Sequence, residues 1–190
     1  MRCFISINFE ESLKREIDKA IEILRSGNAD VKWVPVANMH MTLKFLGNTE
    51  EETASRLNEK LSRLAARHES FRLNLRGTGL FPDRRRPRVV WIDIPDSENL
   101  KELQRDVEEA ALSVGFERED RPFSPHLTIG RVRSSRGMNS LLAAIEALKD
   151  KDFGNIEVSA VSLMKSDLRP AGAQYTTLAE FRLGRRTYDE

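Results

Sequence analysis

Two segments of this sequence combine a histidine with a threonine two residues later. His40 is followed by Thr42, and His126 is followed by Thr128. Around both pairs, apolar residues alternate with polar ones, which predicts β-strands. Successive side chains of a strand point to opposite faces, so each histidine should share a face with its threonine. Two imidazoles and two hydroxyls presented in this way are suited to the chemistry of phosphate esters.

Opening a phosphodiester needs a base that takes a proton from water and an acid that protonates the departing oxygen. Histidine serves both purposes, because its ordinary pKa of ~6.5 makes either protonation state accessible near neutrality. Charge gathers on the non-bridging oxygens in the transition state, and hydroxyl and guanidinium groups can stabilise it. The candidate donors are Thr42, Thr128 and the nearby Arg131.

Arg131 is the difficult member of this set. Strict alternation places it on the face of Leu127 and Ile129, away from His126. A bulge or a strand end at Gly130 would turn it back. An exposed arginine at a strand end is the alternative, and the sequence leaves both open.

Length and composition favour one folded domain over residues 1–190. Hydrophobic residues make up 39% of the chain and charged residues 32%, which is typical of a protein with a core. No apolar run approaches the ~18 residues of a membrane span, and the first residues lack a signal-peptide pattern. Cys3 is the single cysteine, so an intrachain disulfide is excluded. We expect a cytoplasmic protein, a monomer without membrane contact.

The order of elements repeats along the chain. His126 lies 126 − 40 = 86 residues after His40, and the same offset relates other predicted strands. Two strand–helix–strand–helix–strand units, approximately 2–81 and 88–183, suggest an internal duplication. Short polar links between strands favour antiparallel pairing over a parallel α/β sheet. We therefore predict a bilobal α+β domain, with two antiparallel or mixed β-sheets and outer helices around a central cleft.

At these residues the sequence resembles the two-histidine (2H) phosphoesterases. It is most similar to their RNA 2′,3′-cyclic phosphodiesterase branch, also called 2′-5′ RNA ligase. The matching segments are 2–7, 33–35, 40–47, 125–131 and 162–168, with Gly172 and Tyr175 beyond them. One His-x-Thr tripeptide is weak evidence. Two in duplicated strands, the first running into Lys-Phe-Leu-Gly, are a specific signal.

The resemblance implies metal-independent catalysis without a cofactor. The implied substrate is RNA that ends in a 2′,3′-cyclic phosphate, with tRNA fragments among the candidates, and the implied product carries a 2′-phosphate. In this family pattern His40 is the proton donor and His126 the proton acceptor. Thr42, Thr128 and Arg131 would bind the substrate.

Two other functions remain open at this point. The same chemistry in reverse is ATP-independent 2′-5′ RNA ligation, with an RNA 5′-hydroxyl in place of water. A non-catalytic module that binds RNA ends through phosphate is the third possibility. The intact His-x-Thr pairs favour an enzyme, because lysine or arginine would suffice for binding. The spaced His and Cys ligands of a metal motif are absent from the sequence.

Several further residues allow two interpretations. The loop Arg84–Arg88 could grip RNA phosphates or form a solvated hairpin tip. Trp33 and Phe123 could stack on a base, although packing against the core is the simpler expectation. Phe45 is expected in the core by alternation, unless the strand twists near Gly47. His68 ends a predicted helix outside any motif, and we leave it out of the site.

Overall fold

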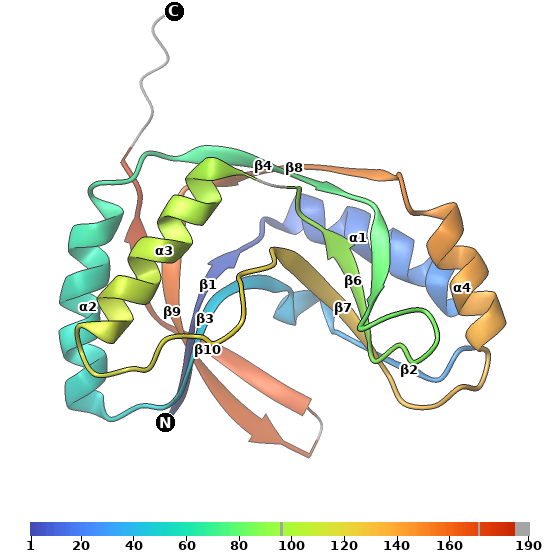
Figure 1. Ribbon diagram of the computed structural model, residues 1–190, viewed down its shortest axis with the longest axis horizontal. Helices are drawn as coiled ribbons and strands as arrows, with labels where there is room; N and C mark the ends of the chain where they lie inside the picture. Colours follow the sequence, from blue (N-terminus) through green and yellow to red (C-terminus); the bar gives the residue numbers. More distant parts are fainter. Residues whose placement is uncertain (96, 171, 185–190) are drawn as a thin grey trace, which may run out of the picture.

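The computed structural model describes residues 1–95, 97–170 and 172–184 (Figure 1). The end of the predicted 1–190 domain therefore lies outside the described residues. The strands are β1 (Arg2–Asn8), β2 (Val31–Trp33), β3 (His40–Asn48), β4 (Phe71–Arg76), β5 (Thr78–Phe81), β6 (Val89–Asp93), β7 (His126–Val132), β8 (Asp152–Val158), β9 (Ala160–Arg169) and β10 (Gly172–Arg182). The helices are α1 (Glu11–Arg25), α2 (Glu51–Ala65), α3 (Glu98–Leu112) and α4 (Met138–Ala147), with a short 3-10 helix, η1 (Val36–Asn38).

The strands form two four-stranded sheets, one in each lobe. The first sheet has the order β10-β9-β1-β3 and the second the order β2-β7-β6-β5. Strands β4 and β8 form a separate two-stranded sheet, which runs across the top of both lobes in Figure 1. All these strand pairs are antiparallel. The predicted bilobal α+β architecture is confirmed, and β4–β8 adds a third sheet to the two that we expected.

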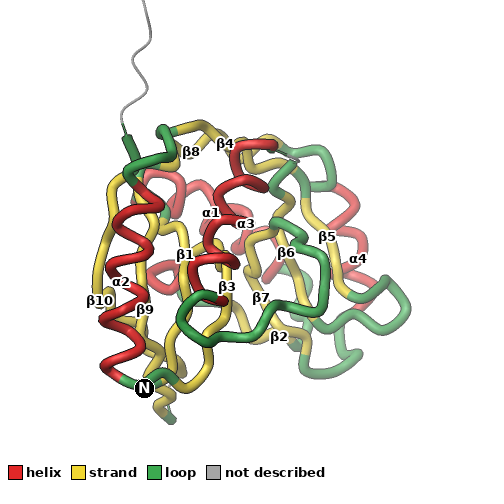
Figure 2. Tube along the Cα trace, turned by 60° about the vertical axis from the view of Figure 1, so that its left-hand side comes forward, coloured by secondary structure: helices red, strands yellow, loops and turns green. Residues whose placement is uncertain are grey.

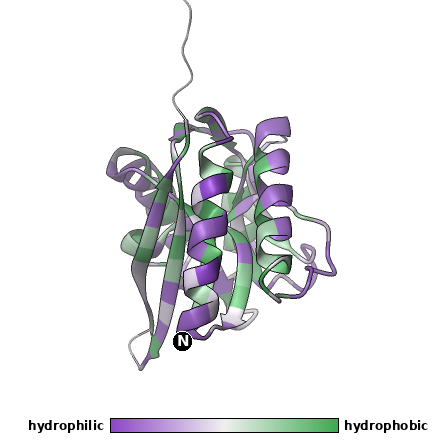
Figure 3. Cartoon of the chain, turned by 90° about the vertical axis from the view of Figure 1, so that its left-hand side faces the viewer, coloured by the Kyte–Doolittle hydropathy of each residue, from purple (hydrophilic) through white to green (hydrophobic). Residues whose placement is uncertain are grey.

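The helices lie on the outside of the sheets (Figures 1 and 2). Helices α2 and α3 pack together against the first sheet, while α1 and α4 pack together in the second lobe. Each helix buries one apolar stripe, as the spacing of its leucines and isoleucines predicts. The helices in Figure 3 accordingly alternate hydrophilic and hydrophobic segments. None of the helices in the described part of the chain has the length and apolar character needed to cross a membrane.

Each lobe is built from both predicted repeats. The first lobe takes β1, β3 and α2 from residues 2–81 and α3, β9 and β10 from residues 88–183. The second lobe mixes the two segments in the same way. Neither lobe could therefore bury its sheet without the other segment. The duplication itself stays a prediction.

A β-bulge interrupts each of the two histidine strands after its threonine. In β3, Thr42 pairs with Ser6 and Lys44 with Ile5, so Leu43 is the extra residue. An extra residue shifts the alternation of the strand by one position. In consequence Lys44, which a regular strand would expose, is buried beside Leu43.

The ammonium group of Lys44 is compensated inside the first lobe. Its Nζ lies 2.8 Å from Oε2 of Glu108 on α3 and donates to the carbonyl oxygen of Glu117 at 2.9 Å. Only 2% of the Lys44 side chain is exposed. Within the described residues Glu108 Oε1 has no hydrogen-bond partner. The pair fixes β3 to α3 and to the loop that leads toward β7.

We expect Lys44→Met to lower the free energy of unfolding by about 3 kcal/mol, because it leaves the Glu108 carboxylate buried without its cation. Adding Glu108→Leu should recover most of this loss, since the buried charge is then gone. Urea unfolding of both variants measures the effect. Equal stability of Lys44→Met and the unaltered protein would show that the pair does not hold the lobe together.

Candidate active site

His40 lies at the start of β3 with one ring nitrogen already engaged. Its Nδ1 is 2.8 Å from the carbonyl oxygen of Asn38. A carbonyl oxygen only accepts, so Nδ1 carries the hydrogen and Nε2 is left for proton transfer. The ring stacks on Phe4 with centroids 4.7 Å apart and meets Tyr175 edge to face at 5.0 Å. The sequence pattern alone does not indicate these two aromatic contacts.

The surroundings of His40 favour its neutral form. Burial lowers the pKa of the imidazole below its ordinary value, and the positive charge of Lys14 lowers it further. The hydrogen bond to Asn38 opposes these effects. A histidinium in this position therefore gives up its proton more readily than one in water.

His126 has the same tautomer-fixing contact in the second lobe. Its Nδ1 is 2.7 Å from the carbonyl oxygen of Ser124, which lies two residues earlier. Asn38 stands at the same spacing before His40. The ring meets Phe81 edge to face at 5.2 Å. Both Nε2 atoms are thus available, and β3 and β7 are neighbours where the lobes meet (Figure 1).

Both threonines lie on the faces of their histidines. Thr42 is directly paired with Ser6 and Thr128 with Trp91, and both are half-buried. Directly paired residues of antiparallel strands share a face. Trp91 and Asp93 are two residues apart on β6 and so share a face. Their partners, Thr128 and His126, therefore share a face as well.

A bulge also returns Arg131 to this face. Gly130 pairs with Val90 and Thr128 with Trp91, so Ile129 is the extra residue of β7. Arg131 then pairs with Val89, on the same side of β6 as Trp91. The side chain of Arg131, five residues after His126, therefore starts from the face that carries the histidine. The register agrees with the bulge, but Arg131 is also exposed near the end of β7, so its contact with substrate stays a prediction.

The expectation for Phe45 is wrong. Its side chain is 68% exposed, because the bulge at Leu43 moves it from the core face to the face of His40. It pairs with Phe4, whose ring centroid is 6.3 Å away. Phe45 follows His40 by 45 − 40 = 5 residues and Arg131 follows His126 by 131 − 126 = 5. Both positions come to the histidine face only through the bulges, which depend on strand pairing.

The other aromatic candidates pack inward. Trp33 and Phe123 are half-buried against the hydrophobic core, as the simpler expectation had it. Sequence reasoning gave no role to Tyr175 and did not consider Asp93, which is directly paired with His126.

The arginine loop is tied to the body of the second lobe. Arg84 forms an ion pair with Glu146 on α4. The backbone amides of Arg85 and Arg86 donate to Oδ1 of Asp83. These contacts hold the loop in place, and its contact with RNA stays a prediction.

His68 follows the end of α2 and contacts α3. Its Nε2 is 2.9 Å from Oδ2 of Asp106. This contact is structural, and leaving His68 out of the site agrees with it.

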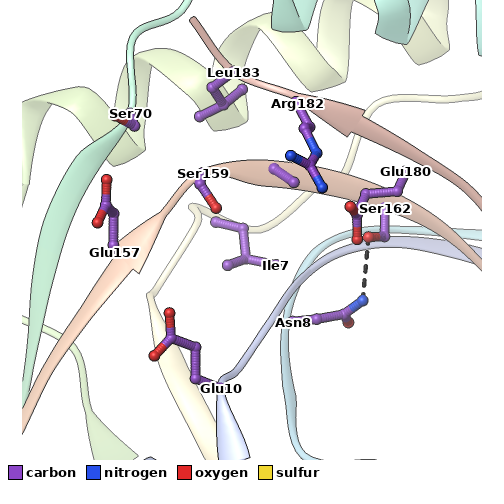
Figure 4. A pocket seen from close by; sticks show the side chains of 11 residues that line it. Ile7, Asn8, Glu10, Ser70, Glu157, Ser159, Ser162, Glu180, Arg182 and Leu183 are labelled. Atoms are coloured by element: carbon purple, nitrogen blue, oxygen red, sulfur yellow. Dashed lines mark hydrogen bonds between the residues drawn. The ribbon is translucent and has the colours of Figure 1, made fainter. Parts of the chain in front are cut away.

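A pocket of about 390 Å³ adjoins the first sheet near Asn8, the residue paired with His40 (Figure 4). Glu10, Glu157 and Glu180 line it, together with Arg182. Neither histidine is among its lining residues. With three carboxylates against one guanidinium, this pocket disfavours phosphate.

The side chains of the described residues do not gather as a metal site requires. No group of three or more His, Cys, Asp and Glu side chains that could hold an ion occurs in the described ranges. The metal-independent catalysis that the resemblance implies stays a prediction.

A family model described as the 2′-5′ RNA ligase superfamily matches residues 10–170, most of the chain. The chain belongs to this superfamily. An RNA 2′,3′-cyclic phosphodiesterase from Methanothermobacter thermautotrophicus is 36% identical over 183 residues, which cover 96% of this chain and 99% of that relative.

Solved structures of the superfamily fold match across nearly the whole chain. TT0787 of Thermus thermophilus has a TM-score of 0.83 at 28% identity, covering 98% of this chain and 100% of its own. Escherichia coli LigT complexed with 3′-AMP has a TM-score of 0.74 at 25% identity, covering 96% and 97%.

We expect the His40 imidazole to titrate below its ordinary value of ~6.5, because burial disfavours the charged ring. The unfolded chain then binds the proton first, so His40 makes folding less favourable as pH falls through ~6.5. An NMR pH titration of the ring resonances measures the midpoint. A midpoint at or above ~6.5 would contradict the expected burial.

Proposed function

We propose that this protein is an RNA 2′,3′-cyclic phosphodiesterase that opens a terminal cyclic phosphate to a 2′-phosphomonoester. The names of its relatives point to this activity. The observation that carries the proposal is the matched setting of the two histidines. Each has Nδ1 tied to the carbonyl two residues earlier, which leaves Nε2 for proton transfer, and a threonine on the same face.

In the proposed reaction the acid and the base are the two Nε2 atoms. His126 takes a proton from water as the water oxygen attacks phosphorus. The bond from phosphorus to the ribose O3′ breaks, and His40 gives that oxygen its proton. Thr42, Thr128 and Arg131 hold the non-bridging oxygens, where hydroxyl and guanidinium donors stabilise the developing charge. No step of this proposal uses a metal ion or a cofactor.

The lowered pKa of His40 has two opposed consequences for a proton donor. A weaker base holds its proton less firmly and releases it more readily to the leaving oxygen. At neutral pH, however, a smaller fraction of the molecules carries that proton. The His40 donor is thus more acidic but less often protonated. The sequence by itself is symmetric between the two histidines.

An oligonucleotide with a 2′,3′-cyclic phosphate end tests the proposed activity. The product should gain the mass of one water and should become sensitive to phosphatase. A synthetic standard with a 2′-phosphate identifies the bond that breaks. An unchanged oligonucleotide at every pH, together with tight binding of an uncleavable analogue, would identify an RNA-end-binding module instead.

Ligation is the second candidate for the same site. If an RNA 5′-hydroxyl occupies the position of the attacking water, the same acid and base yield a 2′-5′ linkage without ATP. Adding a 5′-hydroxyl oligonucleotide to the assay compares the two directions. The name of the family, 2′-5′ RNA ligase superfamily, is the observation that supports ligation as a candidate function.

We expect His40→Ala and His126→Ala each to lower kcat by about 10²- to 10⁴-fold, the usual contribution of a general acid or base. The double variant should lose far less than the product of the two, because the groups act in one step. Steady-state kinetics on the cyclic-phosphate oligonucleotide measure these effects.

His68→Ala is the matched control for these variants. It should leave kcat unchanged and cost about 1 kcal/mol of stability, through the lost contact with Asp106. Full activity in either active-site variant would remove that histidine from the mechanism.

We also propose that Phe45 stacks on the terminal base. It is the largely exposed aromatic side chain on the face of His40. Stacking on an aromatic ring contributes about 1–3 kcal/mol per base, and about 1.4 kcal/mol corresponds to a factor of ten.

Phe45→Ala should therefore raise KM about tenfold and leave stability nearly unchanged, because the side chain is exposed. Ile23→Ala removes a similarly exposed apolar side chain from α1 and should leave KM unchanged. An unchanged KM for Phe45→Ala would place the base elsewhere.

The proposed partner is an RNA end, with tRNA fragments as candidate substrates. We propose that the protein works as a monomer in the cytoplasm. The buried free thiol of Cys3 agrees with a reducing compartment, and sedimentation of the purified protein tests the oligomeric state.

A further inference from the structure

The two histidines face different residues on the neighbouring strand. His40 is directly paired with Asn8 on β1, whereas His126 is directly paired with Asp93 on β6. Side chains of such pairs have Cβ atoms about 4.5–5.5 Å apart. Positions that correspond in the two lobes thus hold a neutral amide and a carboxylate.

Asn8 is committed to neighbours other than His40. Its Nδ2 donates to Oγ of Ser162 at 3.1 Å, and its Oδ1 accepts from Oγ of Ser6 at 3.3 Å. The charged group that acts on His40 is Lys14 on α1, and its sign disfavours a protonated ring. Tyr175 on β10 is the other titratable side chain facing His40.

Asp93 experiences the charge of His126. Burial raises the pKa of its carboxyl group, while a backbone hydrogen bond from Ile94 and the positive charge of His126 lower it. From β5 the group against the ring is Phe81, which is uncharged. On β7, Thr128 shares the face without charge, and Arg131 lies beyond it, opposite Val89.

We propose that Asp93 is the positioning residue of His126, whose carboxylate compensates the positive charge that the ring acquires when Nε2 accepts a proton. This inference rests on the proposed function of the site. Because Nδ1 is already bonded to Ser124, the carboxylate acts through charge rather than by orienting the ring with a hydrogen bond. An opposite charge within a few ångströms favours the charged form of a titratable group.

The arrangement separates two groups that are alike in sequence. His40, in an apolar frame with Lys14 nearby, releases a proton readily. At His126 the directly paired residue carries a carboxylate. The proposal keeps the assignment in which water loses its proton to His126 and O3′ gains one from His40.

Asp93→Asn is the direct test, because it removes the charge and keeps the shape. The value of kcat for the cyclic-phosphate oligonucleotide should fall about three- to tenfold with KM unchanged, because the charge acts in the transition state and not in substrate binding. Asp150→Asn, the same charge change at an exposed position beyond α4, should move neither value.

Asn8→Asp is the mirror variant and does not depend on the folding of Asp93→Asn. It places a carboxylate opposite His40, so the His40 midpoint should rise if a directly paired carboxylate acts on the ring. An unmoved His40 midpoint would contradict the same action of Asp93 on His126. An unchanged kcat in Asp93→Asn, or an effect confined to KM, would overturn the role of Asp93. Failure of the unaltered protein to form product would instead overturn the proposed function.

Discussion

The bulge in each histidine strand is the constraint on which the site depends. A regular strand would bury Phe45 and Arg131 on the core faces and expose Lys44. One extra residue, Leu43 in β3 and Ile129 in β7, reverses all of these positions. Each strand thereby presents three positions on one face, namely the histidine, its threonine and the residue five after the histidine.

The bulge in β3 has an energetic cost that the fold offsets elsewhere. It buries Lys44, and a buried ammonium group is unfavourable without a compensating charge. Glu108 supplies that charge from α3, which belongs to the other predicted repeat. In β7 the bulge is accommodated differently, since a Cβ on Gly130 would lie 2.7 Å from the side chain of Val31. A glycine there lets β2 pack closely against the bulged strand.

Periodicity predicted most of the fold, because helices and strands of this chain bury regular apolar faces. The stripes of Leu57, Leu61 and Leu64, or of Ile5 and Ile7, correspond to buried residues. The third sheet was missed because β4 and β8 are distant in sequence and nothing local specifies their pairing. Phe45 was misplaced for a related reason: a bulge is a property of two paired strands, and one strand's sequence does not reveal it.

The sequence was equally unable to reveal the charged groups that surround the two histidines. Sequence pattern identified the two histidines and their threonines, which lie together on one strand each. It could not distinguish the histidines from one another, since His-x-Thr is identical in both. The differences come from burial and Lys14 at His40 and from the directly paired Asp93 at His126. The groups that make the surroundings of the two imidazoles unequal lie outside the motif, on α1 for His40 and on β6 for His126.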